Sequence, residues 1–460
     1  MSQVTSSEKI ARASKDAFEA SQLVTSAERV TALQAIHDAL AKDKEAIFNA
    51  NRQDMEAART LVASGALSQS LLKRLDLTMS DKFDSMLKGI LDVAALPDPT
   101  GKVTYASELD EGLELYRMTC PIGALLVIFE ARPEVVVNIT ALAVKSGNSA
   151  ILKGGKESTL TSAALSKCIR AALSQTSLHP DYIQTVQTRE EIASLLDQDR
   201  YIDLVIPRGS NALVKSIQNS TKIPVMGHAD GICSVYIDKD ADLGKAERIV
   251  VESKIDYPSA CNAVEILVLH EAVIQSIWPD LSAALLNADV HLRCDPKTLE
   301  TLRSSAIETQ GRQSTHIHAA DPTKDYDTEH LSNIISVIAV PSLQDAIKFI
   351  NAHSSHHTDV IVTESERAAS VFVRGVDSAG TFWNASSRFA DGYRYGFGTE
   401  VGISTGRVHA RGPVGLGGLV IYKYVLRSQN PRGSVIGDFG TGDGKRAWKH
   451  KPMDASSVPF

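Results

Sequence analysis

Residues 122–153 read IGALLVIFEARPEVVVNITALAVKSGNSAILK and contain two apolar runs, residues 122–129 and 149–152, around a helical pattern over residues 135–146. Two buried strands joined by a helix are typical of a βαβ unit in a parallel sheet. Because the alternation continues downstream, we predict a doubly wound, mostly parallel sheet. Further helices are expected over residues 159–174, 190–196 and 211–220, and further strands over residues 183–186 and 204–206.

A second alternating region is expected to form another α/β domain. Its apolar runs predict strands over residues 232–237, 264–269, 336–340, 359–363 and 381–384. Before the first sheet, residues 7–75 show helical spacing and predict amphipathic helices. Alternating stretches around Asp110-Glu111-Gly112 predict a projecting β-hairpin over residues 102–119, and residues 419–426 alternate like an edge strand before a polar tail.

The composition is that of a soluble globular protein, with 43% hydrophobic and 22% charged residues among 460. A net charge of −7 argues against a nucleic-acid or anionic-membrane partner. No apolar run approaches the roughly 20 residues of a membrane span, and residues 1–21 lack a secretory core. Five scattered cysteines without C-x-x-C spacing support neither a disulfide framework nor a zinc site. The cytoplasm is therefore the expected location.

Cys261 lies in a stretch of small residues, DYPSACNA over residues 256–263. A thiol is a strong nucleophile once cations or a helix N-terminus lower its pKa, and its thioester holds a carbonyl that a hydride can attack. An isolated cysteine is more often a buried structural residue. The motifs nearby favour a nucleophile here.

The usual dinucleotide fingerprint G-x-G-x-x-G does not follow the first strand, so phosphates must be held in another way. The turn Pro207-Arg208-Gly209-Ser210 ends a predicted strand and begins a helix, where free N–H groups favour an anion. Taken alone, such a turn is more often only a good helix cap.

Lys153 and Lys156 follow the predicted strand of residues 149–152, at the end of the strand where an adenosine ribose would lie. A 2′-phosphate requires a cation, so Lys156 favours NADP(H) over NAD(H). The alternative is a pair of solvated lysines.

These features together resemble the aldehyde dehydrogenase superfamily. Within it, four segments resemble the γ-glutamyl phosphate reductase family, namely residues 127–134 (VIFEARPE), 227–231 (GHADG), 353–359 (HSSHHTD) and 409–416 (HARGPVGL). The resemblance covers nearly the whole chain. It implies an aldehyde dehydrogenase-like α/β fold with a cofactor-binding domain (residues 1–101 and 120–229), a catalytic domain (residues 230–418) and an oligomerisation element (residues 102–119 and 419–460).

The resemblance also implies roles for the cofactor residues. Lys153 would bond the adenosine ribose, Gly209 and Ser210 would meet the pyrophosphate beside Arg208, and Glu329 would bond the nicotinamide ribose. The Glu329 assignment rests only on spacing to the following strand, and a surface glutamate is the alternative.

Two segments depart from the hydrolytic aldehyde dehydrogenases. Their water-activating glutamate falls where this chain has His228-Ala229-Asp230-Gly231, and their Trp-Asn oxyanion motif becomes Glu130-Ala131-Arg132. A guanidinium suits bidentate phosphate recognition, so Arg132 fits an acyl phosphate. Without the activating base a thioester is protected from water, which favours reduction over hydrolysis.

Three histidines, His353, His356 and His357, invite a zinc interpretation, but no cysteine or acidic ligand set follows at a suitable spacing. We expect no metal. With Thr358 they suit a polar pocket for an amino acid instead. Arg388, beside Ser387, is the candidate for the substrate α-carboxylate, with an ordinary surface arginine as the alternative.

The residues alone support a thiol-dependent, nucleotide-linked acyl reductase. The resemblance implies NADPH-dependent reduction of L-glutamyl 5-phosphate to glutamate 5-semialdehyde through a Cys261 thioester, the second step of proline synthesis. Arg132 and His228 would assist phosphate departure, and the Cys261 N–H with a neighbouring amide, for which Asn262 is the candidate, would hold the oxyanion.

Two other functions remain open at this point, a hydrolytic NAD(P)-dependent aldehyde dehydrogenase and a non-catalytic structural or binding member of the fold. The resemblance also implies a homo-oligomer, either a dimer or a tetramer, and a separate glutamate 5-kinase with which the chain can associate.

Overall fold

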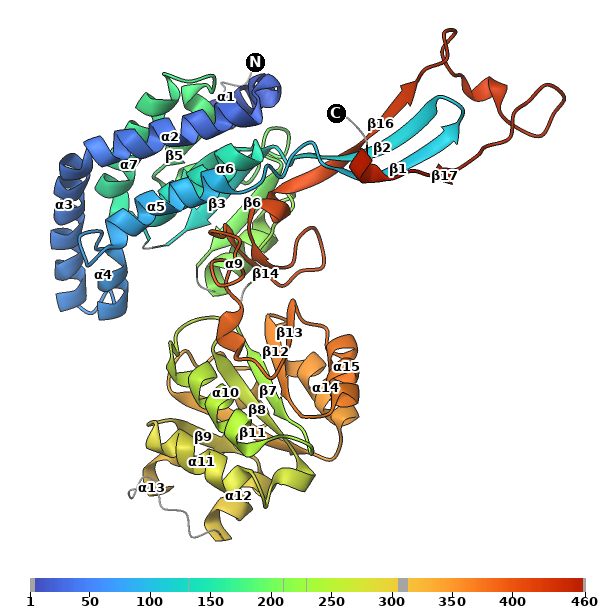
Figure 1. The fold of residues 1–460 in the computed structure, drawn as a ribbon. Coiled ribbons are helices and arrows are strands. Elements are labelled where there is room, and N and C mark those ends of the chain that lie inside the picture. The colour runs from blue at the N-terminus through green and yellow to red at the C-terminus, as the bar shows by residue number, and fades with distance from the viewer. Residues whose placement is uncertain (1–4, 131, 210, 229, 305–312, 458–460) are drawn as a thin grey trace.

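The computed structural model describes residues 5–130, 132–209, 211–228, 230–304 and 313–457 (Figure 1). Two α/β parts lie one beyond the other, and an arm of antiparallel strands projects away from the first of them. Among the described residues, no helix is both long enough and apolar enough to cross a bilayer.

The first part contains a parallel sheet with the strand order β5-β4-β3-β6. Its strands are β3 (Ala124–Phe129), β4 (Ser149–Lys153), β5 (Ile183–Val186) and β6 (Leu204–Arg208). Leu125 and Val127 of β3 face one hydrophobic core, whereas Leu126 and Ile128 face another. Because helices cover both faces, the strands are continuously apolar rather than alternating.

Helices cover this sheet as the sequence predicts. On one face α2, α5, α6 and α7 form the larger core, and on the other α1, α8 and α9 form the smaller one. The bounds are α1 (Ser6–Ala20), α2 (Ser26–Lys42), α3 (Lys44–Ala63), α4 (Gln69–Leu75), α5 (Lys82–Ala95), α6 (Glu134–Ser146), α7 (Thr159–Leu173), α8 (Arg189–Leu195) and α9 (Asn211–Ser220).

The second part is a parallel sheet with the order β10-β9-β11-β8-β7-β12-β13. Its strands are β7 (Cys233–Ile237), β8 (Val264–His270), β9 (His291–Cys294), β10 (Ile317–Ala319), β11 (Ile334–Val340), β12 (Thr358–Val362) and β13 (Gly380–Trp383). The five predicted strands are confirmed. The short strands β9 and β10, of which β10 is at the edge of the sheet, were not predicted, because three or four residues give too little pattern.

Helices cover both faces of this sheet as well. The cores place α10, α11 and α12 on one face and α14 and α15 on the other. The bounds are α10 (Leu243–Ile255), α11 (Trp278–Asn287), α12 (Pro296–Ser304), α13 (Gln313–His316), α14 (Leu343–His353) and α15 (Glu366–Gly375).

The arm confirms the predicted hairpin, β1 (Val103–Asp110) and β2 (Leu113–Pro121), and the predicted C-terminal strand, β16 (Val420–Ser428). Its antiparallel order is β16-β2-β1-β17, so β16 is an edge strand. The polar tail folds back and adds the two-residue strand β17 (Lys451–Pro452) beside β1, which the sequence did not show.

A C-terminal segment links the two parts. After β13 the chain forms the small hairpin β14 (Gly402–Ser404) and β15 (Gly412–Val414), in which β14 contacts β6. Val401 and Leu416 of this segment are buried in the first core. The three domain boundaries given above stay predictions.

A buried ion pair supports the second sheet. Lys254 of α10 donates hydrogen bonds to Glu265 Oε2, at 2.7 Å, and to the backbone oxygen of Val264, and neither charged side chain has any exposed surface. Burial raises the pKa of Glu265 to about 7 and lowers that of Lys254, so each charge depends on the other.

Removing one charge should therefore be far worse than removing both. We expect Lys254→Met to lower the free energy of unfolding by about 3 to 5 kcal/mol, because Glu265 is left buried and unpaired. The double variant Lys254→Met/Glu265→Leu should recover most of this loss in thermal unfolding. Lys245→Met breaks the exposed pair with Glu364 and is the control, expected to cost less than about 1 kcal/mol. Equal losses in both single variants would contradict the prediction.

Candidate functional site

Cys261 lies on the turn between α10 and β8. The Ala263 N–H donates to Ala260 O at 3.0 Å and closes the turn around the cysteine. The side-chain amide of Asn262 donates to Ala390 O at 2.9 Å, and the Ser387 hydroxyl donates to Asn262 O at 2.6 Å. Both polar side chains thus hold the turn in place. Their predicted roles, oxyanion donor for Asn262 and substrate ligand for Ser387, stay predictions.

The segment before β7 passes directly against this turn. A Cβ atom on Gly231 would lie 2.2 Å from Cys261 O, a distance that no side chain can occupy, so only glycine fits. The Gly231 N–H donates to Glu329 Oε1 at 3.0 Å, and the Cys233 thiol donates to Cys261 O at 3.4 Å. The half-buried Glu329 is therefore tied to the site and is not a free surface glutamate.

Two histidines adjoin the thiol. Three atoms lie within 4.8 Å of one another, namely Cys261 Sγ, one ring nitrogen of His228 and one ring nitrogen of His357. The His228 Nδ1–H donates to Ile403 O at 3.1 Å. Because a carbonyl oxygen only accepts, the single proton of the neutral ring must be on Nδ1, and Nε2 keeps its lone pair. His357 is 1% exposed, and its Nδ1 lies 2.9 Å from Thr358 Oγ1.

Both histidines are neutral at neutral pH. Burial lowers the pKa of His228, and it lowers that of His357 to about 3. A neutral imidazole can accept a proton, so either ring can serve as a base for the thiol. The predicted catalytic His228 and the predicted substrate residue His357 are thus brought together at Cys261.

Charged groups of both signs surround the thiol. Burial, together with the carboxylates of Glu400 and Glu329, raises the pKa of Cys261 to about 12, against the opposing effect of the Arg132 guanidinium. Burial lowers the pKa of Arg208, as does the charge of Arg132 nearby. The thiol is therefore protonated at neutral pH, and reaction requires a base to remove its proton.

Arg132 and Arg208 form a cationic group beside Cys261. Arg208 is the last residue of β6, and the sequence assigned it to the cofactor, yet its charge acts on Arg132, Glu400 and Cys261. Glu400 was not predicted, because no motif distinguishes it; its Oε2 accepts a hydrogen bond from the Gly392 N–H at 2.8 Å. Two guanidiniums suit an anionic phosphate better than one.

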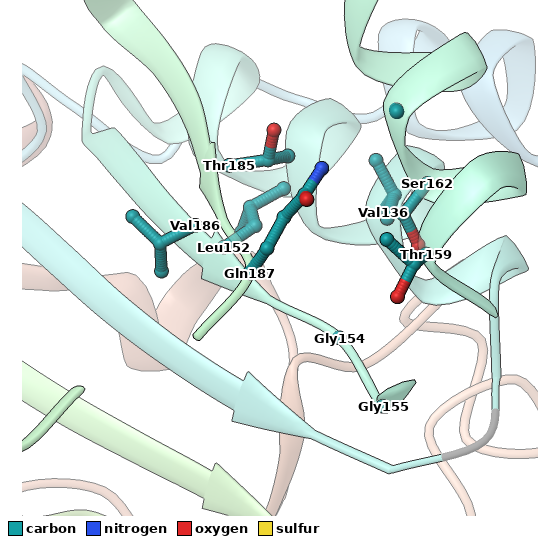
Figure 2. A pocket seen from close by; sticks show the side chains of 10 residues that line it. Val136, Leu152, Gly154, Gly155, Thr159, Ser162, Thr185, Val186 and Gln187 are labelled. Carbon is teal, nitrogen blue, oxygen red and sulfur yellow. The ribbon is translucent and has the colours of Figure 1, made fainter. Parts of the chain in front are cut away.

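A pocket opens at the carboxyl ends of β4 and β5, beside the first turn of α7 (Figure 2). Leu152, Val136 and Val186 supply apolar walls, while polar groups come from other lining residues. The Ser162 hydroxyl is buried and has no hydrogen-bond partner among the described residues. Apolar walls with a few polar groups suit a flat heterocycle such as adenine. The polar lining residues are Thr159, Ser162, Thr185 and Gln187.

Two of the predicted cofactor residues, Lys153 and Lys156, flank this pocket. Lys153 ends β4 and is buried, and Lys156 follows the two pocket glycines, Gly154 and Gly155, with its side chain exposed. Gly209 lies between β6 and α9. Ser210 lies outside the described residues, as do Ala131 and Ala229.

The predicted substrate residue Arg388 is not an ordinary surface arginine. It is 8% exposed, and its Nε donates to Asp256 Oδ2 at 3.0 Å. Asp256 ends α10 and begins the segment that carries Cys261, so this ion pair also steadies the site. The predicted polar-pocket residue His353 is engaged elsewhere, because its Nδ1 lies 2.9 Å from Asp327 Oδ1. An α-carboxylate contact from Arg388 stays a prediction.

Comparison with known proteins fits this geometry. A sequence profile of the aldehyde dehydrogenase family matches residues 1–301. The chain belongs to this family. It is 51% identical to a protein of Schizosaccharomyces pombe named probable gamma-glutamyl phosphate reductase, over 96% of each chain. It is 48% identical to the gamma-glutamyl phosphate reductase of Saccharomyces cerevisiae, over 99% of this chain and all of the relative.

A solved structure gives the same answer. The gamma-glutamyl phosphate reductase of Thermotoga maritima superposes with a TM-score of 0.85 at 33% identity, covering 93% of this chain and 99% of that one. The aldehyde dehydrogenase-like fold is thereby confirmed. Among aldehyde dehydrogenases the chain belongs to the gamma-glutamyl phosphate reductase group and is an oxidoreductase, which excludes a non-catalytic member of the fold.

The raised pKa of Cys261 gives a prediction for the cofactor-free protein. Alkylation of Cys261 by iodoacetamide, measured by mass spectrometry, should rise about tenfold per pH unit and continue to rise beyond pH 9, because only the thiolate reacts. Arg132→Gln should slow alkylation at any given pH, since it removes the charge that lowers the thiol pKa. A rate that levels off near pH 7 would contradict the raised pKa.

Proposed function

We propose that the chain reduces L-glutamyl 5-phosphate to L-glutamate 5-semialdehyde with NADPH, releases phosphate, and so catalyses the second step of proline synthesis from glutamate. Full-length identity of 48 to 51% with proteins named for this activity carries the proposal. The local chemistry supports it, because a half-buried thiol lies beside two neutral imidazoles and within the electrostatic influence of two guanidiniums.

The first step forms the acyl-enzyme. An imidazole of His228 or His357 takes the Cys261 proton, and the thiolate attacks the acyl carbon of the substrate. The carbon–oxygen bond to phosphate then breaks, and its electron pair leaves with the phosphate. Arg132 and Arg208 would neutralise the departing anion, each through charge-assisted hydrogen bonds. The Cys261 N–H and Asn262 would face the oxyanion.

The second step is reduction of the thioester. NADPH, when bound, would supply the hydride that reduces the acyl carbon. The carbon–sulfur bond then breaks, its electron pair returns to the Cys261 sulfur, and the aldehyde is released. The residues of this chain would orient that reaction and exclude water from it. The carboxylates nearest the thiol are both engaged, Glu329 by the Gly231 N–H and Glu400 by the Gly392 N–H, and His228 stands where hydrolytic relatives have their activating glutamate. This arrangement favours hydride transfer over hydrolysis.

The cofactor residues fit the pocket of Figure 2. Its apolar walls would hold the adenine, Lys153 would bond the ribose, and Lys156 would meet the 2′-phosphate. Gly209 and Ser210 would contact the pyrophosphate, while Glu329 would bond the nicotinamide ribose. For the substrate, Arg388, Ser387, His357 and Thr358 would surround the amino-acid end.

The proposed assembly is a homo-oligomer, a dimer or a tetramer, joined through the arm. The edge strand β16 carries the exposed side chains Tyr422, Tyr424 and Leu426, which a second copy would cover. We also propose a cytoplasmic location and an association with a separate glutamate 5-kinase.

The reaction run backwards separates this function from oxidative hydrolysis. With pyrroline-5-carboxylate and NADP, the protein should form NADPH only when inorganic phosphate is present. Cys261→Ala should lose about 10⁴-fold or more in rate, as expected when a covalent nucleophile is removed. Arg132→Lys should mainly raise KM for phosphate, because lysine cannot make a bidentate contact. NADPH formation without phosphate would indicate the hydrolytic enzyme, and activity in Cys261→Ala would overturn the covalent route.

Cofactor choice gives a separate prediction. Lys156→Gln should raise KM for NADPH about tenfold and leave KM for NADH nearly unchanged, because only NADPH carries the 2′-phosphate that the ammonium group would bind; one lost charged contact is worth about 1.5 to 3 kcal/mol. Lys167→Gln, on α7 beyond the pocket, is the matched control and should change neither constant. An equal rise for both cofactors would place the 2′-phosphate elsewhere.

A further inference from the structure

Three donor atoms of the kind that bind zinc converge at Cys261. Its Sγ and one ring nitrogen each of His228 and His357 lie within 4.8 Å of one another. The three residues come from the loop before β7, the turn before β8 and the residue before β12. Their sequence spacing gives no metal signature, and they share only His357 with the closely spaced histidines that the sequence disfavours as a zinc site.

Both imidazole rings have an Nε2 atom that is available to bind a metal ion. His357 is 1% exposed, and its Nε2 has no hydrogen-bond partner among the described residues. His228 donates its Nδ1–H to Ile403 O, which leaves Nε2 to bind. Metal-binding histidines commonly donate their second N–H to a backbone carbonyl in this way, which fixes the tautomer and the ring orientation.

The distances are close to those of a zinc site. Bonds of about 2.3 Å to sulfur and about 2.0 to 2.1 Å to nitrogen place tetrahedral ligand atoms about 3.5 Å apart. Donors within 4.8 Å must therefore approach one another by at most about 1.3 Å, which side-chain rotation allows. A thiolate and two imidazoles select zinc over magnesium or calcium, which prefer oxygen ligands.

We propose that Cys261, His228 and His357 bind one zinc ion and that the bound ion blocks the nucleophile. The S–H bond of Cys261 breaks, a sulfur–zinc bond forms, and the proton passes to solvent without any change of oxidation state. Three protein ligands leave the fourth position to water. Zinc then inhibits reversibly, whichever acyl substrate the enzyme takes, so this inference does not depend on the proposed reaction.

Cobalt(II) reports such a site by absorption, independently of activity. The full-length protein should give a thiolate-to-cobalt charge-transfer band that saturates at one equivalent and disappears when zinc is added. Cys261→Ser should abolish the band, and His357→Asn should weaken binding at least tenfold. Cys120→Ser removes a half-buried thiol of the arm, and His318→Asn removes a half-buried histidine of β10. These two controls should leave the band unchanged.

Protection of the Cys261 thiol from alkylation is a second readout. It can be measured even in variants whose folding is altered. Zinc, but not magnesium, should slow alkylation of Cys261 in the native protein at least tenfold, as measured by mass spectrometry. In His357→Asn, and likewise in His228→Asn, zinc should no longer protect Cys261. A cobalt band that survives in Cys261→Ser, or alkylation that zinc does not slow in the native protein, would overturn the proposal.

Discussion

The site depends on a backbone contact that only glycine permits. Gly231 lies so close to Cys261 O that an added Cβ would be 2.2 Å away, and this contact fixes the loop of His228 against the turn of Cys261. Asn262 and Ser387 hold the same turn from its other side. Cys261 and its neighbouring imidazole are therefore positioned by main-chain packing, which leaves their side chains available for the proposed chemistry.

Burial sets the electrostatics of this arrangement. It holds the thiol and both imidazoles in their neutral forms, because a charge is costly where water is excluded. The same exclusion strengthens the guanidiniums of Arg132 and Arg208 as anion ligands. A neutral thiol beside neutral bases is stable at rest, and a departing phosphate would meet two cations. The site thus avoids a permanently reactive thiolate.

Much of the fold is predictable because both sheets bury both of their faces, so continuous apolar runs and helical periods mark their strands and helices. The short strands β9, β10 and β17 were not predicted, since two to four residues are too few to show a hydrophobic period. Site residues inside compact motifs, such as Cys261 and His228, are recognisable for the same local reason. Glu400 is not, because its place beside Arg208 arises only when the C-terminal segment returns to the first core.

Arg208 shows how one strand end can serve two ligands. Its strand ends beside the predicted pyrophosphate turn, where backbone N–H groups of Gly209 and α9 favour an anion. Its side chain instead shares the charge environment of Arg132, Glu400 and Cys261. In the proposed reaction, the backbone at this strand end would face the phosphates of the cofactor, and the side chain would face the phosphate of the acyl substrate. Both anions would then meet positive potential at the end of β6, the first from backbone N–H groups and the second from a guanidinium.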